Sequence, residues 1–269
     1  MRRAPGAITT LALLVALFPH ATVRAQEPPP PVPCDGCWVP STYLEWQYQL
    51  RSAPSAARPF DLWVVDMFDS DSSLVADLQA TGGRVACYVS AGSWEDWRPD
   101  AGEFPDHVLG KELAGWPGER WLDVRALDDL GPLIAARLDQ CVAKGFDAVD
   151  FDNVNGYANR TGFPLTATDQ LAYNRWLANA AHERGLSVGL KNDGEQASEL
   201  VGYFDFAIVE QCFEYRECAL YRPFVDAGKA VLEVEYGLRR DAFCERAARL
   251  RFSAIRKRRT LGAWRRACP

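Results

Sequence analysis

The sequence predicts an α/β fold, specifically a (β/α)8 TIM barrel. Short runs rich in β-branched and aromatic residues alternate with segments of helical period, and this alternation indicates βαβ units around a parallel sheet. Eight such runs can be counted, which is the strand number of a closed α/β barrel. An open, doubly wound sheet is the main alternative. No proline-rich linker or change in composition divides residues 38–269, so we expect a single domain there.

The predicted strands are apolar runs that end in polar residues. They lie at 61–68, 84–92, 120–125, 147–154, 186–193, 205–212 and 230–236, with a last strand near 252–255. The earlier run 43–50 is expected to be an extra N-terminal strand before the barrel. Alternatively, that run is the first barrel strand and the last strand is peripheral.

The segments between these runs have the pattern of amphipathic helices. Residues 130–145 place leucines and isoleucine on one face and end at Gly145. Residues 166–185 begin at a threonine that can cap a helix and end at Gly185. Shorter helices are expected within 194–204 and 244–261.

The first 25 residues have the pattern of a secretory signal peptide. Arg2 and Arg3 precede a short apolar run, and small residues around Ala25 fit a cleavage site. Residues 26–37 are expected to form a proline-rich spacer outside the fold. We therefore expect a secreted protein, extracellular or periplasmic, that has no membrane association after signal cleavage.

The chain contains eight cysteines. An even number in an exported protein favours disulfides over metal binding, so no metal site is predicted. Cys34 and Cys37 could form a redox or zinc half-site, but a second pair of ligands is needed for zinc. We expect a bridge between Cys212 and Cys218, and the pairing of the other six cysteines stays open.

Several classes of function lack their motifs. The sequence contains three histidines and no G-x-S-x-G, H-E-x-x-H or glycine-rich phosphate loop. His182 is expected at the surface near a helix C-terminus. The formal net charge of −6 argues against a nucleic-acid partner. The chemistry is therefore expected to depend mainly on carboxylates.

Polar residues gather at the predicted strand ends. They are Asp66, Ser90, Asp123, Asp152, Asn192, Glu210 and Glu235. In an α/β barrel these ends face one shared mouth, where active sites lie. Seven such residues at one rim are too many to be helix caps alone, so we predict an active site there.

Two aspartates, Asp150 and Asp152, share one strand. Side chains alternate along a strand, so both point to one face while Val149 and Phe151 point to the other. We expect the apolar pair to pack on outer helices, with Asp152 at the barrel mouth and Asp150 one layer below. Glu233 and Glu235 repeat this spacing. Lys191 could neutralise one of these acids or contact a substrate.

Asp152 and Glu210 are two strands apart and can face each other across the mouth. A carboxylate pair without histidine, metal or nucleotide motifs fits glycoside hydrolysis. Tryptophans and a tyrosine follow the strands and could stack on sugar rings; these are Trp94, Trp97, Trp116 and Tyr157.

Long motifs carry a family resemblance. These are YVSAGSWEDWRPD, GWPGERWLDVR, GFDAVDFDNVNGY, FPLTATDQLAYNRWLANAAHERGLSVGLKND, FDFAIVEQCFEYREC and GKAVLEVEY. In this order they resemble glycoside hydrolase family 114, the endo-α-1,4-polygalactosaminidases. The resemblance implies a (β/α)8 barrel that cleaves α-1,4-linked galactosamine polymers within the chain and needs no cofactor. Asp152 matches the aspartate of the family's D-N motif, and Glu210 the glutamate of its E-Q-C motif.

The resulting hypothesis is a monomeric, retaining glycosidase that acts on a cationic amino-sugar polysaccharide. Asp152 would be the nucleophile and Glu210 the general acid/base. The substrate-binding residues are expected to be Asp66, Tyr88, Asp123, Asp150, Asn153, Lys191, Asn192, Glu235 and Tyr236. The alternatives are a catalytically inactive glycan-binding barrel and a disulfide-stabilised surface protein.

Overall fold

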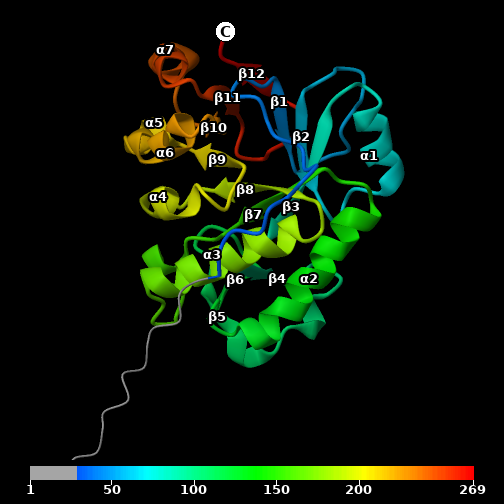
Figure 1. Ribbon diagram of the computed structural model, residues 1–269, viewed down its shortest axis with the longest axis vertical. Coiled ribbons are helices and arrows are strands. Elements are labelled where there is room, and N and C mark those ends of the chain that lie inside the picture. Colours follow the sequence, from blue (N-terminus) through cyan, green and yellow to red (C-terminus); the bar gives the residue numbers. More distant parts are fainter. Residues whose placement is uncertain (1–28) are drawn as a thin grey trace, which may run out of the picture.

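The computed structural model describes residues 29–269 and is built around one nine-stranded sheet (Figure 1). Neighbouring strands are parallel from β1 to β11, and β12 is antiparallel to β11. In spatial order the strands are β1 (Trp46–Gln49), β2 (Leu62–Asp66), β3 (Arg84–Ser90), β7 (Ala148–Asp152), β8 (Ser187–Lys191), β9 (Phe206–Glu210), β10 (Ala230–Glu235), β11 (Ser253–Lys257) and β12 (Arg265–Ala267).

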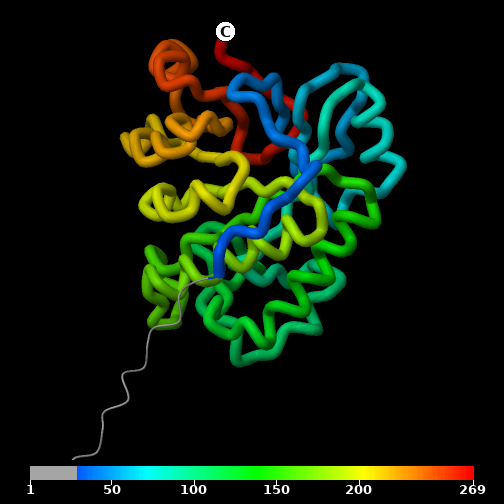
Figure 2. Tube along the Cα trace, viewed as in Figure 1, coloured from blue at the N-terminus to red at the C-terminus, as the bar shows by residue number. Residues whose placement is uncertain are grey.

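The sheet curls into a barrel of eight parallel strands, which confirms the predicted (β/α)8 fold. Its two edges meet where the Trp46 indole donates a hydrogen bond to the Ser253 carbonyl at 2.8 Å and the Leu50 amide donates to the Leu261 carbonyl at 2.9 Å. Helices cover the outside, as the trace in Figure 2 shows. They are α1 (Ser72–Gln79), α2 (Leu127–Ala143), α3 (Ala167–His182), α4 (Ala197–Leu200), α5 (Cys212–Tyr215), α6 (Arg222–Asp226) and α7 (Arg240–Leu250).

The assignment of strands to the barrel differs from the expectation in two places. The run 43–50 supplies β1, the first barrel strand, rather than an extra one. The run 120–125 instead supplies β6 (Glu119–Leu122), which pairs antiparallel with β4 (Ser93–Glu95) and β5 (Leu109–Glu112) in a separate small sheet. This sheet is inserted between β3 and α2, and its strands pair with segments close in sequence. An apolar run alone does not reveal which partner it pairs with.

Side chains alternate between the barrel interior and the helical layer. Ala148 packs inside with residues such as Phe206 and Ile208, whereas Val149 and Phe151 pack in the cluster beneath the helices. The aspartates of β7, two and four residues after Ala148, therefore share its interior face. The structure confirms this predicted orientation.

Four disulfides pair all eight cysteines. The predicted Cys212–Cys218 bridge is present and joins α5 to the following turn. The others are Cys34–Cys37, Cys87–Cys141 and Cys244–Cys268. Cys87–Cys141 ties β3 to α2, and Cys244–Cys268 ties α7 to the C-terminal segment. Each of these bridges limits the freedom of the unfolded chain.

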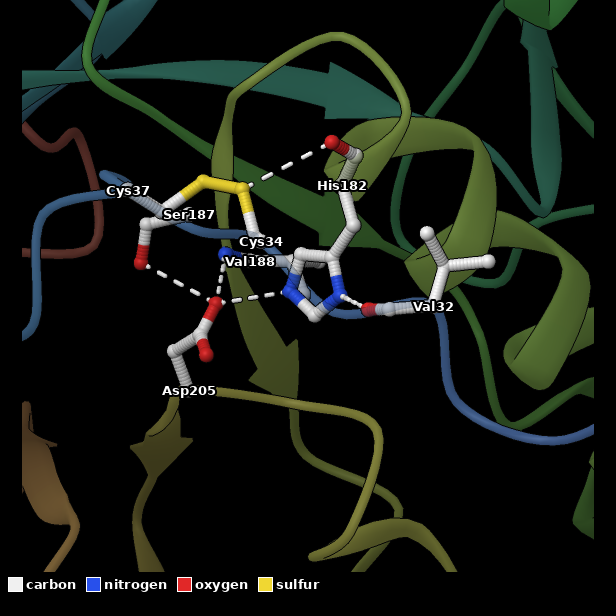
Figure 3. Close-up of a disulfide and its surroundings, with 7 residues drawn as sticks. All are labelled: Val32, Cys34, Cys37, His182, Ser187, Val188 and Asp205. Carbon is white, nitrogen blue, oxygen red and sulfur yellow. Dashed lines mark hydrogen bonds and ion pairs between the residues drawn. A yellow bond between two sulfur atoms is a disulfide. The ribbon is translucent and has the colours of Figure 1, made fainter.

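The segment 29–37 contacts the barrel, so this part of the expected spacer is not outside the fold. The Val32 amide donates to the Asn179 side chain at 2.8 Å, and the Tyr203 hydroxyl donates to the Pro29 carbonyl at 2.7 Å. Figure 3 shows His182 below the Cys34–Cys37 bridge, with its ring between the Val32 carbonyl and Asp205. His182 is thus buried rather than at the surface.

The expected signal peptide, 1–25, lies outside the described residues. Within 29–269, no helix is both long enough and apolar enough to cross a membrane.

Glu233 and Glu235 point away from the barrel interior, which corrects the expectation that Glu235 lines the mouth. Their neighbours Leu232 and Val234 occupy the interior. The Glu235 carboxylate instead accepts hydrogen bonds from the backbone amides of Phe213 and Glu214, at 2.9 and 3.2 Å. All six residues of β10 are buried, so its sequence does not distinguish the inner face from the outer one.

Glu233→Gln is expected to stabilise the protein at alkaline pH. Neither carboxyl oxygen of Glu233 has a hydrogen-bond partner within 29–269. Burial, and then the neighbouring Glu235, hold the pKa of Glu233 well above its usual range. A pKa raised by folding gives stability that is full below the pKa of the unfolded chain, about 4.3, and is lost as pH rises. The variant removes that loss.

Urea unfolding at pH 4 and pH 8 tests this prediction. At pH 8 the variant should exceed wild type by about 1–3 kcal/mol in unfolding free energy, and at pH 4 the two should nearly agree. Glu183→Gln, at an exposed position, is the control and should change neither value. Equal stability of Glu233→Gln and wild type at both pH values would contradict the prediction.

Candidate active site

A cavity of about 750 Å³ opens at the carboxyl ends of the barrel strands. Eight of the eleven predicted site residues line it, namely Asp66, Tyr88, Asp152, Asn153, Lys191, Asn192, Glu210 and Tyr236. They come from β2, β3, β7, β8, β9 and β10 or the residues that directly follow these strands. Of the seven polar strand ends predicted to gather at one mouth, Asp66, Asp152, Asn192 and Glu210 line the cavity, whereas Ser90, Asp123 and Glu235 do not.

Lys191 lies at the centre of the site. Its ammonium nitrogen is 3.0 Å from Asp152 Oδ1 and 3.0 Å from Glu210 Oε2, and its side chain is only 2% exposed. Burial disfavours the charged form, but the surrounding carboxylates outweigh burial and hold the pKa of Lys191 well above its usual range. Lys191 is thus a permanent cation shared by the two predicted catalytic acids.

The Asp152 carboxylate is held in its ionised form. Its Oδ2 accepts a hydrogen bond from the Tyr88 hydroxyl at 2.8 Å, and its Oδ1 accepts one from the Asn153 amide at 2.9 Å. Burial alone raises the pKa of Asp152, but the Lys191 charge and these hydrogen bonds lower it below the usual value. An ionised, oriented carboxylate can act as a nucleophile.

The Glu210 carboxyl is held from two sides. The Tyr236 hydroxyl donates a hydrogen bond to Oε1, and Lys191 approaches Oε2. The Glu210 backbone amide donates to Asn192 Oδ1 at 3.0 Å, which joins the ends of β8 and β9. These contacts orient Glu210 toward the same cation as Asp152.

The chain turns sharply after each of the three central groups. The residues that follow Asp152, Lys191 and Glu210 have positive φ angles: 63° at Asn153, 54° at Asn192 and 59° at Gln211. Asparagine tolerates this left-handed conformation better than most residues, and glutamine does so at a cost. Such backbone is concentrated at functional sites. The turns end each strand so that its last side chain stands at the mouth.

Asp150 lies below the mouth rather than in its lining. It is completely buried, and neither of its carboxyl oxygens has a hydrogen-bond partner in the described chain. Burial raises the pKa of Asp150 to about 7, against the opposing attraction of Lys191. Asp150 is therefore not placed for the expected direct contact with a substrate in the cavity.

A second acidic group lies across the cavity. The Arg98 guanidinium donates to both carboxyl oxygens of Asp66, at 2.9 and 2.7 Å, and to both of Glu95, at 2.7 and 2.8 Å. Glu119 accepts from the Ser93 hydroxyl at 3.0 Å. Burial, and then the Glu95 charge, raise the pKa of Glu119 to about 7.

Sequence reasoning missed Glu95 and Glu119 as cavity residues. Both belong to the small inserted sheet, whose position relative to the barrel no sequence pattern indicates. Glu95 stands between two tryptophans in the stretch SWEDW, and that setting was the available signal. The cavity lining contains six acidic and four basic residues in total, so carboxylates are in excess.

Two of the four proposed stacking aromatics line the cavity. Trp97 and Trp116 lie there and are each 49% exposed. Trp94 instead donates its indole hydrogen to the Ala101 carbonyl at 3.0 Å, and Tyr157 lies outside the lining, with its hydroxyl donating to Glu195 at 3.2 Å. Trp97 and Trp116 therefore keep open ring faces beside the carboxylates.

Asp123 is not part of the cavity. It follows β6 in the inserted sheet, and its two carboxyl oxygens accept hydrogen bonds from Arg125, both at 2.7 Å. Its predicted position rested on assigning 120–125 to the barrel, and the correction of that strand removes it from the mouth.

Comparison with known proteins identifies relatives over nearly the whole described chain. The sequence model of glycoside-hydrolase family GH114 matches residues 29–269. The crystal structure of Aspergillus fumigatus Ega3 in complex with galactosamine is 37% identical, with a TM-score of 0.82, and the match covers 86% of this chain and 97% of Ega3. The glycoside hydrolase domain of PelA from Pseudomonas aeruginosa shares the fold, with 15% identity, a TM-score of 0.65 and coverage of 84% of this chain and 98% of that domain.

A curated relative from Deinococcus radiodurans, described as an uncharacterized protein, is 30% identical over 210 residues. These residues are 66% of this chain and 65% of the relative. The chain therefore spans somewhat less than two thirds of that relative's length.

Proposed function

The chain belongs to glycoside-hydrolase family GH114 and is a glycosidase, and we propose that it cleaves α-1,4-linked galactosamine polymers at internal bonds. The observation that carries this proposal is the pair of carboxyl groups, Asp152 and Glu210, held on either side of Lys191 at the barrel mouth. The similarity to Ega3, which was solved with galactosamine, supports the amino-sugar substrate. The four disulfides fit the expected secretion.

In the proposed mechanism Asp152 attacks the anomeric carbon while Glu210 donates a proton to the departing glycosidic oxygen. This forms a covalent glycosyl–aspartate bond and breaks the bond between the sugars. Glu210, now ionised, then takes a proton from a water molecule, which attacks the anomeric carbon and releases Asp152. No cofactor enters either step.

The geometry around Lys191 favours retention of configuration. Asp152 Oδ1 and Glu210 Oε2 are each 3.0 Å from the same nitrogen, so these two atoms are at most twice that distance, about 6 Å, apart. Retaining glycosidases hold their carboxyl groups about 5–5.5 Å apart, whereas inverting enzymes need roughly 6.5–9.5 Å to admit a water molecule. The bound of about 6 Å on the two nearest oxygens lies closer to the retaining separation than to the inverting one, and this supports the proposed retention.

The excess of carboxylates in the cavity supports a cationic substrate. Galactosamine units carry ammonium groups, and the acidic group formed by Asp66, Glu95 and Glu119 faces the same cavity as the catalytic pair. The open faces of Trp97 and Trp116 could stack on pyranose rings beside these acids. We propose that these residues hold the polymer across the mouth.

The deciding experiment measures release of reducing ends from α-1,4-linked galactosamine oligomers and from their fully N-acetylated counterparts. We expect cleavage of the cationic oligomers at internal bonds, with products of intermediate length early in the reaction. N-acetylation removes the charge, so cleavage should slow by at least about tenfold. Binding without cleavage would support the inactive glycan-binding barrel instead, and absence of binding would refute the proposed substrate.

The first product formed from an α-linked oligomer is expected to be the α-anomer. Proton NMR recorded during the first minutes distinguishes the anomers before they interconvert. A β-anomeric first product would show inversion and would contradict the proposed nucleophilic role of Asp152, while leaving the substrate assignment intact.

A further inference from the structure

A second cavity, of about 210 Å³, lies outside the barrel beside β1 and β2. In the described chain, no helix separates these two strands in sequence, and only a loop, 50–61, connects them (Figure 1). The cavity is lined by Arg58 and Phe60 of this loop, by Trp63 of β2 and by Arg265 of β12. None of these residues lines the active-site cavity.

Buried hydrogen-bond donors at this cavity have no acceptor. The Arg265 side chain is only 4% exposed, and its guanidinium makes no hydrogen bond to any residue within 29–269; its Nε is completely buried. The Trp63 indole nitrogen is likewise buried and without a partner. Leaving a buried donor unsatisfied costs about 1–3 kcal/mol, and more when it is charged.

Positive charge is in excess around the same cavity. Arg58 and Arg265 both lie over the Phe60 ring, 5.0 and 4.8 Å from its centroid. Lys257 is paired with Arg265 across β11 and β12 and donates only to neutral oxygens, of Gln47 and Gly262.

The nearest carboxylate, that of Glu45, balances part of this charge. It is 60% exposed and lies 3.5 Å from Arg58 and 3.9 Å from Arg265. One exposed carboxylate beside two arginines leaves a net positive site. Burial lowers the pKa of Lys257 to about 7 and that of Arg265 to about 10, so at neutral pH Arg265 stays charged whereas Lys257 is only partly charged.

We propose that this cavity is a binding site for a small oxyanion, such as sulfate or the carboxylate of an acidic sugar. Arg265 would donate to the oxyanion from its guanidinium fork, and Arg58 would add a second cation from the rim. Phe60 and Trp63, whose rings meet edge to face with centroids 4.8 Å apart, form the apolar wall. The site is independent of the proposed cleavage reaction, because none of its residues belongs to the active-site cavity.

The test follows the indole N–H signal of Trp63 in nitrogen-15 correlation spectra, assigned by its loss in Trp63→Phe. At constant ionic strength, sodium sulfate and sodium galacturonate are titrated separately, with neutral galactose as the control ligand. We expect a saturable shift with a dissociation constant on the order of 1 mM for at least one anion. Galactose should cause none.

Arg265→Gln should weaken this binding by at least about tenfold. Arg266→Gln makes the same charge change at the adjacent exposed residue and should leave it unchanged. If Arg265→Gln does not fold, Arg58→Gln at the rim replaces it, with an expected weakening of a few-fold.

The arms of the titration also distinguish the source of the oxyanion. Saturation by galacturonate at least tenfold tighter than by sulfate would assign a sugar carboxylate, and comparable affinities would assign a general oxyanion site. A linear, non-saturating response to both anions would overturn the proposal. Equal affinities in wild type, Arg265→Gln and Arg266→Gln would overturn it as well.

Discussion

Asp152→Asn and Glu210→Gln are each expected to lower kcat on galactosamine oligomers by about 10³-fold or more. Asparagine keeps the size of Asp152 but cannot form the covalent bond to the anomeric carbon. Glutamine keeps the size of Glu210 but has no proton to give the departing oxygen, and general acid catalysis contributes about 10²–10⁴-fold. Both variants should still bind the oligomers, because the rest of the cavity lining is unchanged.

Rescue by azide separates the two roles. With an aryl glycoside whose leaving group needs no proton, Glu210→Gln should form the covalent intermediate, and added azide should accelerate its breakdown to a product of retained configuration. Asp152→Asn should instead give, with azide, a product of inverted configuration. Glu183→Gln, at an exposed position on the outer surface, is the control and should keep full activity. An unchanged kcat in either active-site variant would refute the role assigned to that residue.

The part of the site that could be predicted from sequence rests on side-chain alternation. On β7 alternation places Asp150 and Asp152 on the face opposite Val149 and Phe151, and the expectation that this apolar pair packs beneath the helices is correct. On β10 the pattern is the same, with Glu233 and Glu235 on one face and Leu232 and Val234 on the other, but there the apolar face is the interior, and the prediction for Glu235 was wrong. Alternation shows which side chains share a face, but it does not show which face meets the helices, because both faces of these barrel strands are buried.

The barrel could be predicted because βαβ units repeat, but the identity of its strands could not be fully predicted. A run of strand-forming residues at 120–125 resembles a barrel strand, yet β6 pairs within an antiparallel insertion. The consequence extends to the site, since Asp123 lies outside the cavity while Glu95 and Glu119 lie inside it. Pairing between segments is a tertiary property, which depends on contacts that local composition does not specify.

Lys191→Met is expected to have the second large effect, on both activity and stability. In wild type one buried ammonium is shared by the carboxyl groups of Asp152 and Glu210 and attracts Asp150 below them. Removing one partner of a buried ion pair costs roughly 3–5 kcal/mol, because the remaining charges stay uncompensated. The pKa of Asp152 should rise, so less of the ionised nucleophile is present at neutral pH, and kcat should fall by at least about 10²-fold.

The loss of stability in Lys191→Met should depend on pH, because Lys191 lowers the pKa of Asp152 in the folded protein. A carboxyl group whose pKa is lowered by folding adds stability above the pKa of the unfolded chain, about 3.9, and that stability is lost as pH falls. Lys191→Met removes this contribution, so the difference in unfolding free energy from wild type should be large at pH 7 and should become small only well below the unfolded pKa, at about pH 2. Urea unfolding at the two pH values measures it.

A double variant shows whether the cost arises from unpaired carboxylates rather than from lost packing. Adding Asp150→Asn to Lys191→Met removes one buried carboxyl whose oxygens have no hydrogen-bond partner in the described chain, so it should restore part of the stability at pH 7 without restoring activity. A purely steric effect of methionine would leave the double variant no more stable than the single one. A pH-independent loss of stability would likewise contradict the role of Lys191 as the shared cation. Stability and kcat are measured separately. If the double variant recovers stability but not kcat, Lys191 serves the reaction through Asp152 and Glu210 as well as holding the barrel mouth together.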